Sequence, residues 1–146
     1  MRHQKIFYPY FDLVRQKTMK GIEFILLGLG AVLGAFLRYK IASYPLLLGN
    51  LVSNVLLINI LGSFILGVFS VISASLNLDA RYSFFVAIGF CGSLTTMSSF
   101  ALESVNMIDN RQFLNVSVNI IANVALSLLA VYGGRTLISH ILQSTI

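Results

Sequence analysis

The sequence predicts an all-α integral membrane protein with four transmembrane helices, the third of them broken at mid-membrane. Three observations predict this fold class: few charges, long uncharged runs, and glycine and hydroxyl residues crowded into the middle of the third helix. Of the 146 residues, 57% are hydrophobic and only 10% are charged, whereas a soluble domain carries about a quarter charged residues because its surface faces water. The composition therefore excludes a soluble enzyme.

The charged residues leave four uncharged runs, which are residues 24–37, 41–78, 82–102 and 112–134. A helix needs roughly 20 apolar residues to cross a hydrocarbon core about 30 Å thick, so each of the last two runs fits one crossing. The second run is too long for one crossing and leaves almost nothing for a turn between two. We therefore expect a helix over about 53–76 after an irregular or interfacial lead-in. The lead-in is indicated by Pro45, Gly49, Asn50, Ser53 and Asn54.

The first uncharged run is short for a crossing and ends at Arg38. Long basic side chains can extend their charged ends toward the interface, so Arg38 and Lys40 permit a helix over about 22–43. The alternative is that Arg38 faces a watery vestibule.

The N-terminal residues 1–18 are expected to form a basic, aromatic arm, and residues 19–146 the four-helix membrane domain. Met19 directly precedes the first helix, so either Met1 or Met19 is the expected native start. A cleaved signal peptide is not expected, because no short apolar core with a small-residue cleavage site follows the basic region.

Basic residues outside the arm are balanced between the two sides of the membrane. One side would hold Lys20, Arg81 and Arg135, and the other side Arg38, Lys40 and Arg111. Because an excess of Lys and Arg on the cytoplasmic side sets orientation, this balance suits a chain that inserts both ways, whereas the arm would pull the N-terminus inward. The net charge of +5 indicates contact with the cytoplasm or lipid headgroups rather than with nucleic acid.

Pairs of small residues on the first two helices predict close helix packing. Gly30 and Gly34 form one pair, and Ser63 and Gly67 form the other. Small residues four positions apart let another helix backbone approach closely. Since four short helices enclose little interior, a solute path is built more easily between two copies than within one, and we expect a dimer.

The middle of the third helix is the most informative segment. Glycine and hydroxyl residues disfavour a continuous helix, and a break at membrane depth is tolerated only where it is buried or lines a cavity. Freed carbonyls would suit a hard cation, whereas freed amides and hydroxyls would suit an anion. The alternative is a packing face of small residues. The residues concerned are Gly89, Gly92, Ser93, Thr95, Thr96, Ser98 and Ser99.

Polar side chains in the other helices are further candidates. Asn59 lies among aliphatic residues, where it would either form an interhelical hydrogen bond or donate to a permeating solute. On the fourth helix, a spacing of four residues aligns a polar stripe, which is either a donor-lined track or an asparagine packing ladder. The stripe consists of Asn115, Asn119, Asn123 and Ser127. Glu103 is either a solvated charge at a helix end or a residue at a pore mouth.

The sequence contains no catalytic motif. His3 and His140 lie in the tail regions without a second ligand at metal-binding spacing, and Cys91 is interpreted as a small buried hydrophobic residue. A passive or coupled transport function is therefore favoured over enzymatic chemistry.

Three motifs resemble those of the Fluc/CrcB fluoride channels. Residues 89–103 read GFCGSLTTMSSFALE, residues 28–39 read GLGAVLGAFLRY, and residues 58–67 read INILGSFILG. The resemblance implies an antiparallel dimer in the plasma membrane, in contact with lipid, that exports fluoride passively through two pores and holds a structural sodium ion at its centre.

The resemblance also implies roles for individual residues. Backbone carbonyls of Gly92 and Thr95 would hold the sodium ion. Arg38 would lie near a vestibule, and Glu103 near the end of the pore. The residues that would line the fluoride pathway are Asn59, Met97, Ser98, Phe100, Asn119, Asn123 and Ser127.

Met97 departs from the family pattern, which normally has a phenylalanine there. A ring presents a positive edge to an anion, whereas a thioether is only polarizable and adaptable. The substitution raises the alternative of a heterodimeric channel in which this chain needs a second, similar subunit. A small multidrug/proton antiporter is a weaker alternative, because it would need a carboxylate in the middle of the first helix and Glu23 lies at its start.

Overall fold

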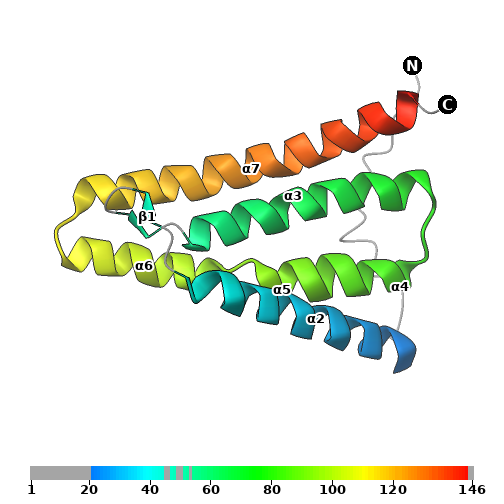
Figure 1. The fold of residues 1–146 in the computed structure, drawn as a ribbon, viewed down its shortest axis with the longest axis horizontal. Coiled ribbons are helices and arrows are strands. Elements are labelled where there is room, and N and C mark those ends of the chain that lie inside the picture. Colours follow the sequence, from blue (N-terminus) through cyan, green and yellow to red (C-terminus); the bar gives the residue numbers. More distant parts are fainter. Residues whose placement is uncertain (1–20, 45–46, 49–50, 53, 145–146) are drawn as a thin grey trace, which may run out of the picture.

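The computed structural model describes residues 21–44, 47–48, 51–52 and 54–144 of the chain. Within these residues, four helical segments are long and apolar enough to cross a membrane, and they lie along a common axis (Figure 1). The protein is therefore an all-helical, multi-pass membrane protein, as the sequence predicts. The segments are α2 (Gly21–Ala42), α3 (Asn54–Ser75), a composite third segment (Ala80–Asp109) and α7 (Phe113–Ser144).

The third segment is not a single helix. It consists of α4 (Ala80–Ser83), the π-helix η1 (Phe84–Cys91), α5 (Gly92–Leu94) and α6 (Met97–Asp109). Between α5 and α6 the backbone is extended, with φ −69° and ψ 152° at Thr95 and φ −147° and ψ 109° at Thr96. The predicted break in the third helix is confirmed and lies at these two residues.

The observed bounds of the other segments agree with the sequence except at α7. Helices α2 and α3 each end within one residue of the predicted bounds. Helix α7 continues for 32 residues to Ser144, past Arg135, so His140 is helical and not in a tail. A charge marks the end of the hydrocarbon-facing stretch and does not by itself end a helix, because exposed charged residues are good helix formers.

The lead-in to α3 contains a short antiparallel pair, β1 (Leu47–Leu48) and β2 (Leu51–Val52). Asn54, the buried first residue of α3, donates from Nδ2 to the carbonyl oxygens of Ile41 at 2.6 Å and Tyr44 at 2.7 Å. This amide satisfies carbonyls at the C-terminal end of α2. The predicted lead-in residues Pro45, Gly49, Asn50 and Ser53, and the arm 1–18, lie outside the described residues.

Glycines permit the closest packing in the bundle. Helix α2 packs along η1, and α3 packs along α7. A Cβ at Gly30 would meet the carbonyl oxygen of Phe85, and one at Gly34 would meet that of Phe90. Gly67 on α3 contacts the backbone of Val131 on α7 in the same way. The predicted small-residue packing is confirmed at Gly30, Gly34 and Gly67, since the backbones approach where side chains are absent.

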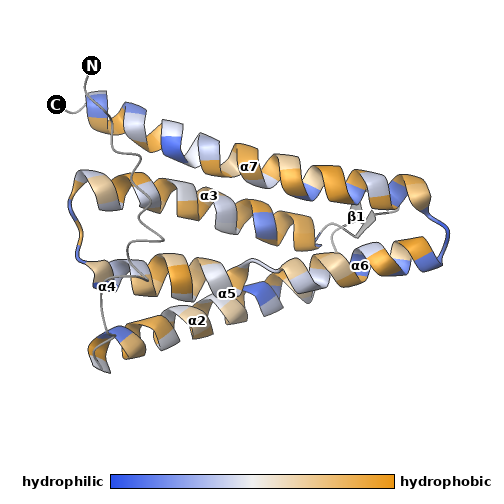
Figure 2. Cartoon of the chain, turned by 180° about the vertical axis from the view of Figure 1, so that it is seen from behind, coloured by the Kyte–Doolittle hydropathy of each residue, from blue (hydrophilic) through white to orange (hydrophobic). Residues whose placement is uncertain are grey.

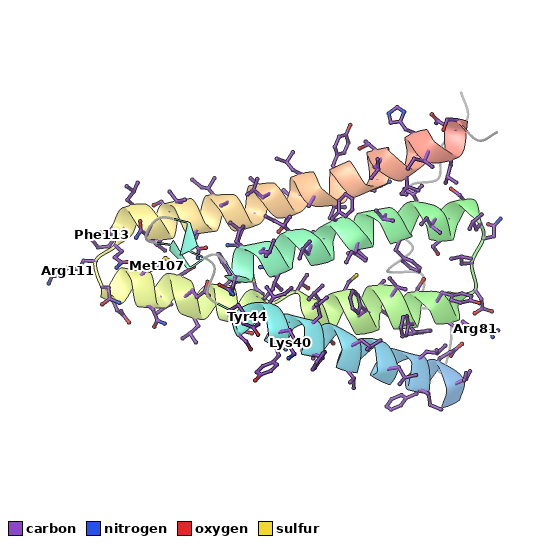
Figure 3. The ribbon with its side chains drawn as sticks, viewed as in Figure 1. Lys40, Tyr44, Arg81, Met107, Arg111 and Phe113 are labelled. Carbon is purple, nitrogen blue, oxygen red and sulfur yellow. The ribbon has the colours of Figure 1, made fainter. Side chains whose placement is uncertain are left out.

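The outer surface of the bundle is apolar. Many large hydrophobic side chains on α2 and α7 are exposed, among them Phe24 and Leu128, and hydrophobic colour runs along the helices in Figure 2. Polar residues concentrate at the ends: Figure 3 shows Arg81 at one end of the bundle and Arg111 at the opposite end. This arrangement suits a lipid environment around the middle of the bundle.

We expect Gly34→Ala to destabilise the protein by about 1–3 kcal/mol, because a methyl group would overlap backbone atoms of Phe90 in a well-packed interface. Thermal unfolding in detergent provides the measurement. Gly28→Ala is the matched control on the same helix, since a Cβ there meets nothing within 4 Å. Equal stability of the two variants would contradict the close contact between α2 and η1.

Candidate functional site

A cavity of about 470 Å³ lies beside the helix break. It is bounded by α3, η1, α5, α6 and α7. Seven of the eleven site residues predicted from the sequence line it, which are Asn59, Gly92, Thr95, Met97, Phe100, Asn123 and Ser127. Residues far apart in the sequence therefore meet at one place in the bundle, and this cavity is the candidate site.

The break frees backbone groups, and Asn59 bonds one of them. The Thr96 N–H donates to Asn59 Oδ1 at 2.9 Å, instead of to the Gly92 carbonyl that it would meet in a continuous α-helix. Thr96 is also the N-cap of α6: its Oγ1 accepts from the Ser99 N–H at 3.2 Å and donates to Ser99 Oγ at 3.0 Å. Residues of both α3 and α6 therefore stabilise the break through hydrogen bonds to Thr96.

The asparagine stripe on α7 forms a hydrogen-bonded chain that extends to Asn59. Asn59 Nδ2 donates to Asn123 Oδ1 at 2.9 Å. Asn123 Nδ2 donates to Asn119 Oδ1 at 2.9 Å, and Asn119 Nδ2 donates to Ser104 Oγ at 3.2 Å. Asn119 and Asn123 are both buried. Asn115 lies outside this chain and donates to Gln112 Oε1 at 3.3 Å, so only part of the predicted stripe faces the cavity.

The residues at the start of α6 differ in exposure. Met97 is 74% exposed and Phe100 is 8% exposed, although both line the cavity. Ser98 is exposed, and its Oγ lies 3.4 Å from Thr96 Oγ1. The phenylalanine is therefore part of the packed core of one chain, whereas the methionine lies at the open side of the cavity.

The two charged residues predicted near a vestibule or pore mouth lie away from the cavity lining. Arg38 lies on α2, one helical turn beyond Gly34, which contacts Phe90 and Leu94 shortly before the break. Lys40 lies in the last turn of α2 and Tyr44 just after that helix; both are labelled in Figure 3. Glu103 on α6 is half-exposed, but its Oε2 is buried and has no hydrogen-bond partner among the described residues.

The oxygen atoms at the break are of the chemical type that binds a hard cation. Gly92 is exposed at the surface of the single chain. In a continuous helix its carbonyl would accept from the Thr96 N–H, but that N–H donates to Asn59 instead. Monovalent hard cations are held by backbone carbonyls of this sort. Among the described residues, no group of three or more His, Cys, Asp or Glu side chains could hold a metal, so a cation here would rest on backbone and hydroxyl oxygens.

Comparison with known proteins places the chain in a family. The family model described as CrcB-like protein, Camphor Resistance (CrcB), matches residues 25–135, which is most of the chain. The chain belongs to the CrcB-like family. The resemblance seen in the three sequence motifs is thereby confirmed.

Relatives of this CrcB-like chain carry a more specific name, fluoride-specific ion channel FluC. The relative from Nitrosopumilus maritimus is 58% identical over 126 residues, which cover 86% of this chain and all of that protein. The one from Methanococcus maripaludis is 39% identical over 113 residues, covering 77% of this chain and 93% of the relative. A third, from Methanocaldococcus jannaschii, is 36% identical over 115 residues, covering 79% and 93%.

Three polar residues of the CrcB-like site are not among the eleven predicted site residues: Ser63, predicted only as a packing residue, Thr96, predicted only as part of the broken segment, and Ser104. Thr96 lines the cavity and caps α6. The sequence could have indicated this cap, because a threonine directly before a helix start is a typical N-cap residue. Ser104 ends the asparagine chain. A serine inside a helix usually bonds its own backbone, so the sequence carries no signal for a contact with α7.

We expect Thr96→Val to destabilise the protein by about 1 kcal/mol, the usual effect of losing an N-cap side chain. Thr96→Ser retains the hydroxyl and should restore most of that stability. Thr136→Val is the matched control, because Thr136 on α7 bonds only its own helix backbone. Thermal unfolding in detergent distinguishes these variants, and equal melting of Thr96→Val and Thr136→Val would argue against the cap.

Proposed function

We propose that this chain is a fluoride-selective channel that exports fluoride passively across the plasma membrane and lowers its cytoplasmic concentration. One observation carries the proposal: the cavity at the broken helix is lined by five of the seven residues to which the resemblance assigns the fluoride pathway, and Asn119 bonds one of the five. The relatives named fluoride-specific ion channel FluC support the choice of ion.

The chemistry of the cavity suits a small, strongly hydrated anion. Removing water from such an ion costs many kcal/mol, so several donors must replace the water at once. The described residues that line the cavity provide amide, hydroxyl and aromatic-edge groups and carry no ionised side chain. Uncharged donors bind an anion weakly enough for it to leave again. Conduction requires such weak binding at several sites in succession.

The absence of ionised groups in the described lining also bears on the antiporter alternative. Coupling to protons requires a group in the transport path that takes up and releases a proton. The carboxylate of α2, Glu23, lies in the first turn of that helix and outside the cavity lining. The site and the relatives therefore favour a passive channel.

We further propose an antiparallel dimer with a sodium ion on the carbonyls of Gly92 and Thr95. Gly92 and Met97 are exposed on the single chain although they lie at the middle of the third segment. A second copy packed against this face would close the cavity and bring a second pair of carbonyls to the ion. The ion would place positive charge near the anion path, which lowers the cost of dehydrating an anion there.

The role of Asn59 is tested by Asn59→Asp. A carboxylate still accepts from the Thr96 N–H, but it lacks the N–H that donates to Asn123 and carries a charge that repels anions. We expect fluoride efflux from liposomes, followed with a fluoride electrode, to fall to the level of protein-free liposomes. Phe100→Ile should have the same effect, because it removes the ring edge from the lining.

The matched control for this charge change is Asn110→Asp. Asn110 is exposed between α6 and α7 and bonds only the Asn106 carbonyl, so we expect its efflux to equal that of the wild type. Full efflux from Asn59→Asp or Phe100→Ile would refute the assignment of the cavity as the pore.

The position of Met97 provides a separate test of the pathway. Met97 lines the cavity at its open side on the single chain, so we expect Met97→Phe to preserve or raise fluoride efflux by adding a ring edge to the lining. Efflux in liposomes of the purified chain alone is the measurement. A complete loss of efflux in Met97→Phe would show that the methionine fits a different local packing. If the wild-type chain carried fluoride only after a second chain was added, the heterodimer would be favoured.

A further inference from the structure

The hydrogen bonds beside the cavity form one directed chain. It starts at the backbone N–H of Thr96 and passes through Asn59, Asn123 and Asn119. It then reaches Ser104, whose hydroxyl accepts from Asn119 Nδ2 at 3.2 Å. After the Thr96 N–H, which only donates, each residue accepts from the one before it, and each of the three asparagines donates to the one after it. Three of the members, Asn123, Asn119 and Ser104, are at least nine-tenths buried.

The far end of the chain is fixed by a backbone carbonyl. The Ser104 hydroxyl donates to the carbonyl oxygen of Phe100 at 2.8 Å. A hydroxyl has a single hydrogen, so once Ser104 donates to Phe100 it can only accept from Asn119. This contact therefore orients the Asn119 amide with Nδ2 toward Ser104 and Oδ1 toward Asn123.

The near end is fixed just as firmly. A backbone N–H only donates, so the atom of Asn59 that faces Thr96 must be Oδ1, and Nδ2 must face Asn123. The orientations required by the two ends meet between Asn123 and Asn119, where Nδ2 and Oδ1 lie 2.9 Å apart. The Asn119 carbonyl oxygen also accepts from Asn123 Nδ2, at 3.0 Å. The Thr96 N–H thus orients Asn59, the Asn119 carbonyl helps to orient Asn123, and the Phe100 carbonyl, through Ser104, orients Asn119.

The orientation matters because an amide has a positive and a negative end. Asn59 and Asn123 both line the cavity. If one amide in the chain reversed, its neighbour would have to reverse or lose its partner, and carbonyl oxygens would replace N–H groups next to the cavity. Inside a protein, hydrogen-bonded chains polarise one another and an unpaired group is costly, so the direction is set for the chain as a whole.

We propose that Ser104 is a positioning residue for anion selectivity: by ending this chain on the Phe100 carbonyl, it keeps Asn119 Oδ1 toward Asn123 and so reinforces the orientation of the Asn123 amide that an anion requires. The proposal rests on the proposed fluoride channel function. Ser104 itself lies outside the cavity lining, so it acts through Asn119 and Asn123 and not by touching the ion. The chain explains why a buried serine and a buried asparagine face each other behind the pore.

The test is the ratio of fluoride to chloride permeability, taken from reversal potentials in planar bilayers with potassium fluoride on one side and potassium chloride on the other. We expect Ser104→Ala to lower this ratio about tenfold, the scale of one buried hydrogen bond. Ser104→Thr retains the hydroxyl and should restore the ratio. A purely structural role would reduce the yield of folded protein without changing the ratio.

A double-mutant cycle covers the case in which Ser104→Thr does not fold. Asn119→Leu interrupts the same chain at the residue that precedes Ser104, so combining it with Ser104→Ala should lower the ratio no further than the larger single effect. Additive effects of the two substitutions would overturn the proposal. Ser117→Ala is the matched control, because Ser117 on α7 also donates to the carbonyl four residues before it but lies outside the chain; its ratio should be that of the wild type.

The outcomes separate this proposal from the function on which it rests. A wild-type chain that carries no fluoride would overturn the channel function itself. A selective wild type together with an equally selective, folded Ser104→Ala would leave the channel intact and overturn only the role of Ser104. Equal loss of selectivity in Ser104→Ala and Ser104→Thr would show that shape at this position matters and that the hydroxyl does not.

Discussion

The rest of the structure depends on how the broken helix satisfies its backbone in an apolar environment. Each backbone polar group left without a partner in hydrocarbon costs several kcal/mol, so irregular backbone occurs at membrane depth only where protein or water surrounds it. The Thr96 N–H is satisfied by Asn59 from the neighbouring helix α3, and the Thr96 side chain caps the helix that follows. The break is thus stable only within this bundle, and the cavity beside it is a direct consequence.

Close packing of the other helices allows Asn59 to reach the backbone at the break. The glycines of α2 allow its backbone to touch η1, which fixes the segment before the break. Helix α3, which carries Asn59, is held against α7 by the close contact of Gly67 with Val131. Since α3 and α7 approach so closely, Asn59 and Asn123 lie within hydrogen-bonding distance. Small residues at the helix contacts therefore position the polar residues at the site.

The sequence predicts the features that depend on composition and local spacing. The uncharged runs predict α2 and α3 almost to the residue, and the cluster of glycine and hydroxyl residues predicts the break. The choice of Thr95 and Thr96 within that cluster depends on Asn59, which is 37 residues away, and a single sequence does not show that contact. The π-helix η1 is missed for the same reason, because packing determines it. The length of α7 is missed because Arg135 ends the uncharged run but not the helix.

The polar stripe on α7 shows what an asparagine contributes that a hydroxyl residue would not. A hydroxyl offers one hydrogen, whereas an amide offers a donor and an acceptor on separate atoms. Amides can therefore link side chains on two other helix segments in one fixed direction, as Asn123 and Asn119 link Asn59 on α3 to Ser104 on α6. Donors held in this way cannot turn to suit a different ion. In the proposed channel, whose described cavity lining has no ionised side chain, we expect selection among anions to rest on fixed geometry and not on charge.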